Sequence, residues 1–435
     1  MMEKYIWKKS NELLNEQKKY LPGACHYNFH GTKIIQNIVF EKANGSRVWD
    51  VDGNEYLDLY AKSGTMILGH CNRVVNEYMS NALERVVSVN DTIYTQEVVK
   101  KIHECFPSIE MMRFSLSGTE AIQNVFRLAR AYTGKQKIVR FLGHFHGSGD
   151  NVLGNSCNDK YQPCENYKET NSTEGRFRGA LEETLVVPWN DYEKLYKIIS
   201  LYEDDIAAII MEPIMVNNGS IMPKEGYLQK VRKLCDTKNI LLIFDEVITG
   251  FRVGLGGVQK MLGVKPDLSI VGKSISNGII PLTVFGGKKD IMQLYVDQKV
   301  VHLGTYNGYP LAMAAANVTI TQLMKCNTYE KMGKKAKEIK RIMEMTAKKM
   351  NIPFHLQGPL LCMSYHFTEK KLENYKQDIR EIAKKAFFHN MCDSYGVLFA
   401  APSRIYLNTE IDDNDLDFFE ERIYYAFDNS RDILS

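Results

Sequence analysis

The alternation of short apolar runs with helical segments limits what this chain can fold into more than any other feature. The runs at residues 206–211, 240–244 and 268–271 are too short for buried helices and are apolar almost throughout. A segment with helical spacing, 225–238, separates the first two runs. Such strands, alternating with helices, are typical of a mainly parallel sheet covered on both faces. No Gly-x-Gly-x-x-Gly sequence follows a run, so a dinucleotide-binding fold is not supported.

Charged side chains stand at the ends of two of these runs. Asp245 follows the run at 240–244, and Lys273 follows the run at 268–271 after a single glycine. The carboxyl ends of parallel strands are where open α/β sheets bind ligands. Pyridoxal phosphate needs both groups, a lysine amine for a Schiff base and an acidic partner for its ring nitrogen. The pair favours a pyridoxal-phosphate site, although any single lysine is more often a surface residue.

Two further motifs carry candidate ligand-binding residues. Ser117, Gly118 and Thr119 precede a helical segment, and small polar residues at a helix start can bind an anion through free N–H groups. Taken alone, this motif is better explained as an ordinary helix cap. Phe145 lies between two glycines after a predicted strand, where it either stacks on a flat ring or packs into a turn. His146 and the other histidine of that turn have no third ligand at zinc-site spacing, so we expect no metal site.

Length and composition restrict the remaining possibilities. A chain of 435 residues is long enough for a large and a smaller domain, and we predict the divisions 1–75, 76–315 and 316–435. The first and last segments form the small domain, and the middle segment binds the cofactor. A net charge of +3 argues against nucleic acid and membrane partners. Nine scattered cysteines, without a Cys-x-x-Cys pair or an apolar leader, predict reduced thiols in the cytoplasm.

The outer parts of the chain give simpler patterns. Segments 39–42, 47–51 and 55–59 alternate apolar and polar residues around Gly-containing turns and predict a small antiparallel sheet. We expect one helix over 1–20 with Leu13 and Leu14 facing inward, and a single helix over 373–390. The long polar stretch 148–178 is typical of an active-site lid or of a disordered segment.

Six short motifs together give a more specific result. They are Ser-Gly-Thr-Glu-Ala from 117, Gly-His-Phe-His-Gly from 143, Met-Glu-Pro-Ile from 211, Asp-Glu-Val-Ile-Thr-Gly-Phe-Arg from 245, Gly-Lys-Ser-Ile from 272 and Gly-Thr-Tyr-Asn-Gly-Tyr-Pro-Leu-Ala from 304. Each is weak alone, but their combination and order resemble the class III aminotransferases of pyridoxal-phosphate fold type I. Within that family the chain looks most similar to the glutamate-1-semialdehyde aminomutase branch. The resemblance runs from about 22 to about 416. It implies an α/β fold, with a large domain on a mainly parallel seven-stranded sheet and a smaller α+β domain.

The resemblance also implies roles for individual residues. Lys273 forms the Schiff base with the cofactor and then moves the substrate proton, and Asp245 pairs with the ring nitrogen. Phe145 and Val247 pack on the two faces of the ring. Thr305 matches a threonine that reaches the phosphate in the neighbouring subunit, which implies a homodimer. The other implied cofactor contacts are Ser117, Gly118, Thr119, His146, Glu212 and Asn217.

Departures from the branch pattern concern the substrate. His30 stands where the branch has an arginine that holds the substrate carboxylate, and histidine lacks the bidentate fork of arginine. Ser63 replaces a tryptophan, and Ala401 replaces a glutamate. A pocket with these changes should not favour glutamate-1-semialdehyde. Arg404 is either a replacement anion-binding residue or a charge at the edge of a strand.

We therefore expect a transaminase that takes an amino group from an amino-acid donor such as L-glutamate. An aldehyde or ketone acceptor, for example in sugar or specialised metabolism, receives the group in a second half-reaction of a ping-pong Schiff-base mechanism. The alternative on the same cofactor is an intramolecular aminomutase or a racemase. A catalytically silent binding protein is a third possibility, against which the presence of both Lys273 and Asp245 argues.

Overall fold

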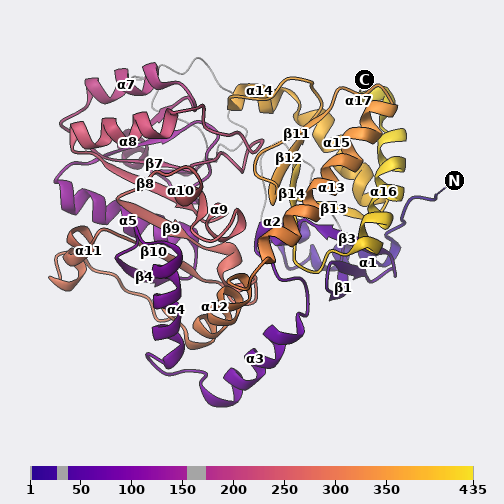
Figure 1. Ribbon diagram of the computed structural model, residues 1–435, viewed down its shortest axis with the longest axis horizontal. Helices are drawn as coiled ribbons and strands as arrows, with labels where there is room; N and C mark the ends of the chain where they lie inside the picture. The colour runs from indigo at the N-terminus through magenta and orange to yellow at the C-terminus, as the bar shows by residue number, and fades with distance from the viewer. Residues whose placement is uncertain (1, 27–37, 154–172, 435) are drawn as a thin grey trace.

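The chain forms two lobes joined along a broad contact. The computed structural model describes residues 2–26, 38–153 and 173–434. A larger lobe is built on a seven-stranded sheet, and a smaller lobe brings the N-terminal and C-terminal segments together (Figure 1). The predicted α/β class is confirmed. His30 lies outside the described residues, as does most of the polar stretch 148–178 for which we predicted a lid or disorder.

The sheet of the larger lobe has the strand order β4-β10-β9-β8-β7-β5-β6. Five neighbouring strands, from β9 to β6, run parallel, while β10 is antiparallel to both β9 and β4. The predicted strands β7, β8 and β9 are buried from end to end, as their apolar sequences require. The strands are β4 (Met111–Ser115), β5 (Lys137–Phe141), β6 (Thr184–Val187), β7 (Ile206–Met211), β8 (Leu241–Glu246), β9 (Leu268–Val271) and β10 (Thr283–Gly287).

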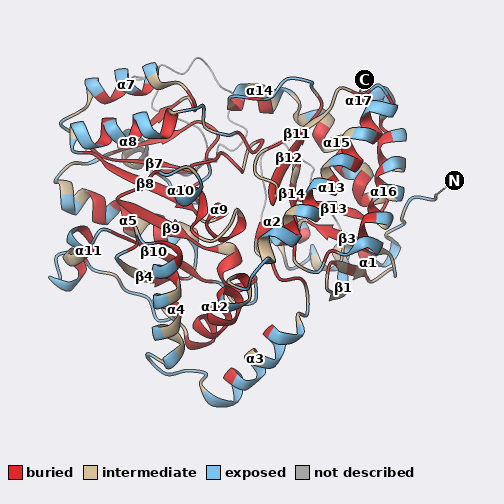
Figure 2. Cartoon of the chain, in the orientation of Figure 1, coloured by how far each residue is buried: buried red, intermediate tan, exposed pale blue. Residues whose placement is uncertain are grey.

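Helices cover the large sheet, and their polar faces point outward (Figure 2). The helix α12 is an exception, because it is apolar all round and almost wholly buried. Within the described part of the chain, no helix has the length and apolar character needed to cross a bilayer. The longer helices here are α3 (Arg73–Arg85), α4 (Ile93–Cys105), α5 (Gly118–Thr133), α7 (Tyr192–Leu201), α8 (Tyr227–Lys238), α11 (Lys289–Val296) and α12 (Pro310–Leu323). The short ones are α6 (Arg178–Glu182), α9 (Thr249–Arg252) and α10 (Gly257–Met261).

The smaller lobe contains two small sheets, β1-β2-β3-β13 and β11-β12-β14. The strands β1, β2 and β3 form the predicted antiparallel sheet, and β13 from the C-terminal segment pairs parallel with β3. Distant parts of the sequence therefore form one unit, although the exact domain limits stay a prediction. The strands are β1 (Phe40–Asn44), β2 (Arg47–Asp50), β3 (Glu55–Leu59), β11 (His355–Gln357), β12 (Cys362–His366), β13 (Val397–Phe399) and β14 (Arg404–Tyr406). The helices are α1 (Lys8–Gln17), α13 (Thr328–Lys349), α14 (Tyr375–Arg380), α15 (Ile382–Ser394), α16 (Asp413–Asp428) and α17 (Arg431–Leu434).

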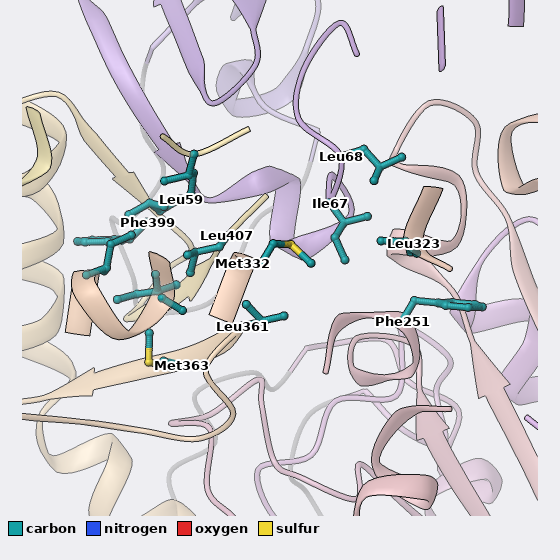
Figure 3. Close-up of a cluster of buried hydrophobic side chains, with 14 of the residues drawn as sticks. Leu59, Ile67, Leu68, Phe251, Leu323, Met332, Leu361, Met363, Phe399 and Leu407 are labelled. Atoms are coloured by element: carbon teal, nitrogen blue, oxygen red, sulfur yellow. The ribbon is translucent and has the colours of Figure 1, made fainter. Parts of the chain in front are cut away.

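One apolar cluster runs from the smaller lobe into the larger lobe (Figure 3). Leu59 and Phe399 belong to the small four-stranded sheet, whereas Phe251 and Leu323 belong to helices of the larger lobe. Ile67, on the segment between the lobes, lies between these two groups (Figure 3). Burying these side chains together fixes the lobes relative to each other, and with them any site at their junction.

Two helix predictions need correction. The N-terminal helix is shorter than 1–20, and Leu13 is 50% exposed instead of facing inward. The Asp52 carboxylate accepts hydrogen bonds from the backbone N–H groups of Lys9 (2.6 Å) and Ser10 (3.0 Å), so polar contacts anchor this helix. The predicted helix over 373–390 is two helices, because the backbone leaves helical geometry at Glu381, whose carboxylate accepts the N–H of Phe367.

Candidate active site

The ends of three neighbouring strands of the large sheet form one cavity. Glu212 directly follows β7, Asp245 is the fifth residue of β8, and Lys273 follows β9 after Gly272. Because β8 lies between β7 and β9, the three side chains reach the same edge of the sheet. All three line a cavity of about 340 Å³. The charged groups that we expected at the strand ends thus lie together in the wall of one cavity.

Lys273 is held in an environment that disfavours its charge. Burial in the cavity wall lowers the pKa of its ammonium group to about 8, and the charge of Arg404 acts in the same direction. The Glu212 and Asp245 carboxylates oppose this shift but do not cancel it. A lysine with such a pKa is partly deprotonated near neutral pH, which is the form that attacks carbonyl groups.

Asp245 is oriented by two protein contacts. Its Oδ2 lies 2.7 Å from Nδ1 of His146, and its Oδ1 accepts the N–H of Val247 at 3.1 Å. The His146 ring is completely buried, and among the described residues its Nε2 has no hydrogen-bond partner. Asp245 itself also lines the cavity. The histidine therefore serves to position the carboxylate and does not face the cavity.

Glu212 joins two loops that flank the cavity. Its carboxylate accepts the N–H groups of Phe145 (2.8 Å), Val216 (3.1 Å) and Asn217 (3.2 Å). Burial raises the pKa of Glu212 despite these three bonds. Phe145 and Asn217 both line the cavity, so this carboxylate fixes the position of two walls at once. His144 accepts the Glu212 N–H at its Nδ1, and burial lowers the pKa of its imidazole.

The start of α5 forms another wall. Ser117 caps the helix, since its side chain accepts the N–H of Glu120 at 3.3 Å, and Thr119 Oγ1 accepts the N–H of Ser148 at 3.2 Å. The predicted helix cap is therefore confirmed for Ser117. Ser117, Gly118 and Thr119 also line the cavity, so the cap does not exclude an anion site at this helix start. The first N–H groups of an α-helix have no acceptor within the helix and favour an anion.

Thus nine of the predicted residues come together: Ser117, Gly118, Thr119, Phe145, Glu212, Asn217, Asp245, Val247 and Lys273. Thr305 does not join them, because it lies in an exposed turn away from this cavity. Neither Ser63 nor Arg404 lines the cavity, but Arg404 donates a hydrogen bond to Asn217 Oδ1 on the cavity wall, at 2.7 Å. Among the described residues, no group of three or more potential ligands suggests a metal site.

The sequence-based interpretation missed several lining residues. Lys62 reaches the cavity from the turn after β3, and Thr65 follows on the same segment. Ile280 and Leu282 come from the segment between β9 and β10. No short motif marks these positions: Lys62 and Thr65 belong to the segment that follows the small sheet, and the other two residues lie just before β10.

Comparison with known proteins identifies the family. The family model for class III aminotransferases matches residues 28–400. The chain belongs to the class III aminotransferases. Among relatives of this class III protein, the glutamate-1-semialdehyde 2,1-aminomutase of Legionella pneumophila is 36% identical over 402 residues, or 90% of this chain and 91% of that protein. Glutamate-1-semialdehyde 2,1-aminomutase 2 of Bacillus pumilus is 34% identical over 442 residues, or 98% and 99% of the two chains.

Solved structures of class III enzymes have the same fold. An omega-transaminase from Sphaerobacter thermophilus superposes with a TM-score of 0.89 at 25% identity and covers 97% of this chain and 98% of its own. A glutamate-1-semialdehyde aminomutase from Pseudomonas aeruginosa gives a TM-score of 0.86 at 22% identity, with coverage of 98% and 95%. The second likeness shows the fold alone. These findings confirm both the family resemblance and the predicted fold.

Proposed function

We propose that this chain is a pyridoxal-phosphate enzyme that transfers amino groups, and that its reaction is transamination between an amino-acid donor and an aldehyde or ketone acceptor. The supporting observation is the Lys273 amine, with a pKa of about 8, in one cavity with Asp245. A nucleophilic amine beside a carboxylate that suits a protonated ring nitrogen is the combination this cofactor uses.

The residues present fit pyridoxal phosphate. Lys273 would hold it covalently, Asp245 would accept the ring N–H, and Gly118 and Thr119 at the start of α5 would bind the phosphate. Gly147 supports this assignment, because it has a φ of 91° and a Cβ atom there would collide with Thr119. Any larger residue would fill the cradle beside the helix start. Phe145 is 40% exposed and therefore offers a ring face for stacking, opposite Val247.

Residues of the chain itself would transfer the proton, exclude water and complete the phosphate site. When bound, the cofactor withdraws electrons from the amino carbon of the substrate. Nζ of Lys273 takes and returns the proton at that carbon, since its lowered pKa suits both directions near neutral pH. Phe145 and Val247, which line the cavity, would cover the ring and exclude water. Thr305 of a second copy would complete the phosphate site, which explains its exposure here and its absence from the cavity wall.

An intramolecular aminomutase is the second candidate, and the relatives named above favour it over transamination. An aminomutase and a transaminase share the half-reaction in which an amine is transferred to the cofactor. They differ in whether an oxo product leaves the protein. The substitutions Ser63 and Ala401 argue against glutamate-1-semialdehyde as the substrate in either case.

Visible absorbance of the purified holoenzyme tests the proposal. We expect L-glutamate to convert the yellow pyridoxal form to the pyridoxamine form, with release of 2-oxoglutarate in stoichiometric amount. Conversion by glutamate-1-semialdehyde without a released oxo product would instead establish the aminomutase. The variant Lys273→Ala should keep its circular dichroism spectrum and lose all turnover. Normal turnover by that variant would refute the assignment.

A further inference from the structure

Lys62 lies where the catalytic cavity meets a second cavity. It lines the cavity of Lys273 and also a neighbouring one of about 530 Å³. The second cavity has an apolar wall, with Phe40, Leu398 and Phe399, and its polar members include Asp58. Lys62 therefore places a positive charge at the junction of the two spaces.

The backbone that carries Lys62 is strained. Ala61, Lys62 and Ser63 have φ values of 46°, 47° and 57°, and Gly64 continues the same left-handed turn at 82°. Left-handed backbone is unfavourable for residues other than glycine, because the Cβ atom then lies too close to the following carbonyl oxygen. Such conformations persist only where the surroundings impose them, and they concentrate at binding and catalytic sites.

Two charged side chains impose this turn. The Asp58 carboxylate accepts the N–H groups of Tyr60 (2.9 Å) and Ala61 (2.8 Å) at its start. The buried Arg252 guanidinium donates to the carbonyl of Gly64 at 2.7 Å at its end. The turn is therefore held at both ends, and the direction in which it presents Lys62 is fixed.

A second cation borders the same junction. Arg404 donates to Asn217 Oδ1, on the wall of the catalytic cavity, and to the carbonyl of Ala401, on the wall of the second cavity. Among the described residues, its buried Nε has no hydrogen-bond partner. Arg404 lines neither cavity itself, but its guanidinium connects a wall residue of one cavity to a wall residue of the other.

We propose that Lys62, together with Arg404, binds a carboxylate or phosphate group of the substrate at the junction of the two cavities, an inference that rests on the proposed function. The ammonium group of lysine and the planar guanidinium of arginine are the usual protein partners of carboxylate and phosphate groups. With the anionic group held there, the substrate's amino or carbonyl carbon lies toward Lys273. Lys62 is then a residue that determines specificity for anionic substrates.

Calorimetric titration of the holoenzyme tests this assignment without turnover. The anionic probes are glutarate and glycerol 3-phosphate, and the neutral partners are pentanediamide and glycerol. The variants are Lys62→Met, which keeps the aliphatic stem, and Lys62→Arg, which keeps the charge. Lys331→Met, on an exposed position of α13, is the control for loss of one positive charge. Thermal unfolding and bound-cofactor absorbance establish that each variant is intact.

We expect wild type to bind one of the anions at least tenfold more tightly than its neutral partner. Lys62→Met should weaken the binding of that anion by ten- to a hundredfold, which is the effect expected from losing a hydrogen bond to a charged group. Lys62→Arg should retain most of the affinity, and Lys331→Met all of it. Preference for glutarate or for glycerol 3-phosphate identifies the anion as carboxylate or phosphate.

Two results would overturn the assignment: Lys62→Met binding the anions like wild type, or wild type binding neither anion more tightly than its neutral partner. Failure of the proposed function is a separate observation, because it would appear as a holoenzyme that no amino donor converts to the pyridoxamine form. Anion binding can still be measured by calorimetry in that case, because the titrations do not depend on turnover.

Discussion

Replacing Lys273 by methionine should stabilise the cofactor-free protein at neutral pH. Folding lowers the pKa of this amine from 10.5 to about 8. Since the folded value is the lower one, the unfolded chain binds more protons between these pH values, and the stability contributed by Lys273 rises with pH through that window. This pKa difference corresponds to about 3 kcal/mol, nearly all of which is a penalty at pH 7. Methionine removes the penalty and keeps the unbranched stem.

The assay is urea unfolding of both cofactor-free proteins at pH 7 and pH 9.5. Linkage through the two pKa values predicts that the stability advantage of Lys273→Met shrinks by about 2 kcal/mol between these conditions. Other groups that titrate in this range cancel in the difference between wild type and variant. Lys331→Met should show a difference from wild type that does not change with pH. A constant difference for Lys273→Met, or a loss of stability at pH 7, would contradict the buried-amine argument.

Other substitutions test the remaining parts of the site. Asp245→Asn should lower kcat by about a hundredfold or more, because a neutral amide does not stabilise a positively charged ring nitrogen. The cofactor should stay bound. Steady-state kinetics measures kcat, and visible absorbance measures the bound cofactor. Arg252→Met should lower the free energy of unfolding by about 3 kcal/mol in urea, since it leaves three backbone carbonyls without their donor. Gly147→Ala should weaken cofactor binding about tenfold in a fluorescence titration, because its Cβ displaces Thr119 at the start of α5.

The positions of Lys273 and Asp245 could be predicted because their surroundings leave a strong local pattern. Strands β8 and β9 are buried on both faces, so their sequences are mainly apolar up to their carboxyl ends. The first charged residue then marks the strand end. Glu212 gives the same signal after β7, but its role does not follow from the pattern. That role depends on the approach of the Phe145 loop, 67 residues away, whose N–H the carboxylate accepts.

The left-handed turn at 61–64 could not be predicted, because Ala61, Lys62 and Ser63 have no preference for that conformation. Tertiary contacts create it, and the Arg252 side chain that holds its end comes from 188 residues further along the chain. The same reason explains why sequence patterns missed Lys62 as a cavity residue. A residue whose direction is set by a distant side chain leaves no periodic or motif signal of its own.

The residues proposed to hold the cofactor and those proposed to select the substrate come from different parts of this molecule. The groups that suit the cofactor stand at the ends of strands in one sheet, and this is the part that the family motifs record. The departures from the aminomutase pattern gather elsewhere: Ser63 is the neighbour of Lys62 in the strained turn, and Ala401 lines the second cavity and binds Arg404 through its carbonyl. Each changed position thus adjoins one of the two cations proposed to bind the substrate. We therefore propose that amino-transfer chemistry is combined in this molecule with a substrate site formed around Lys62 and Arg404.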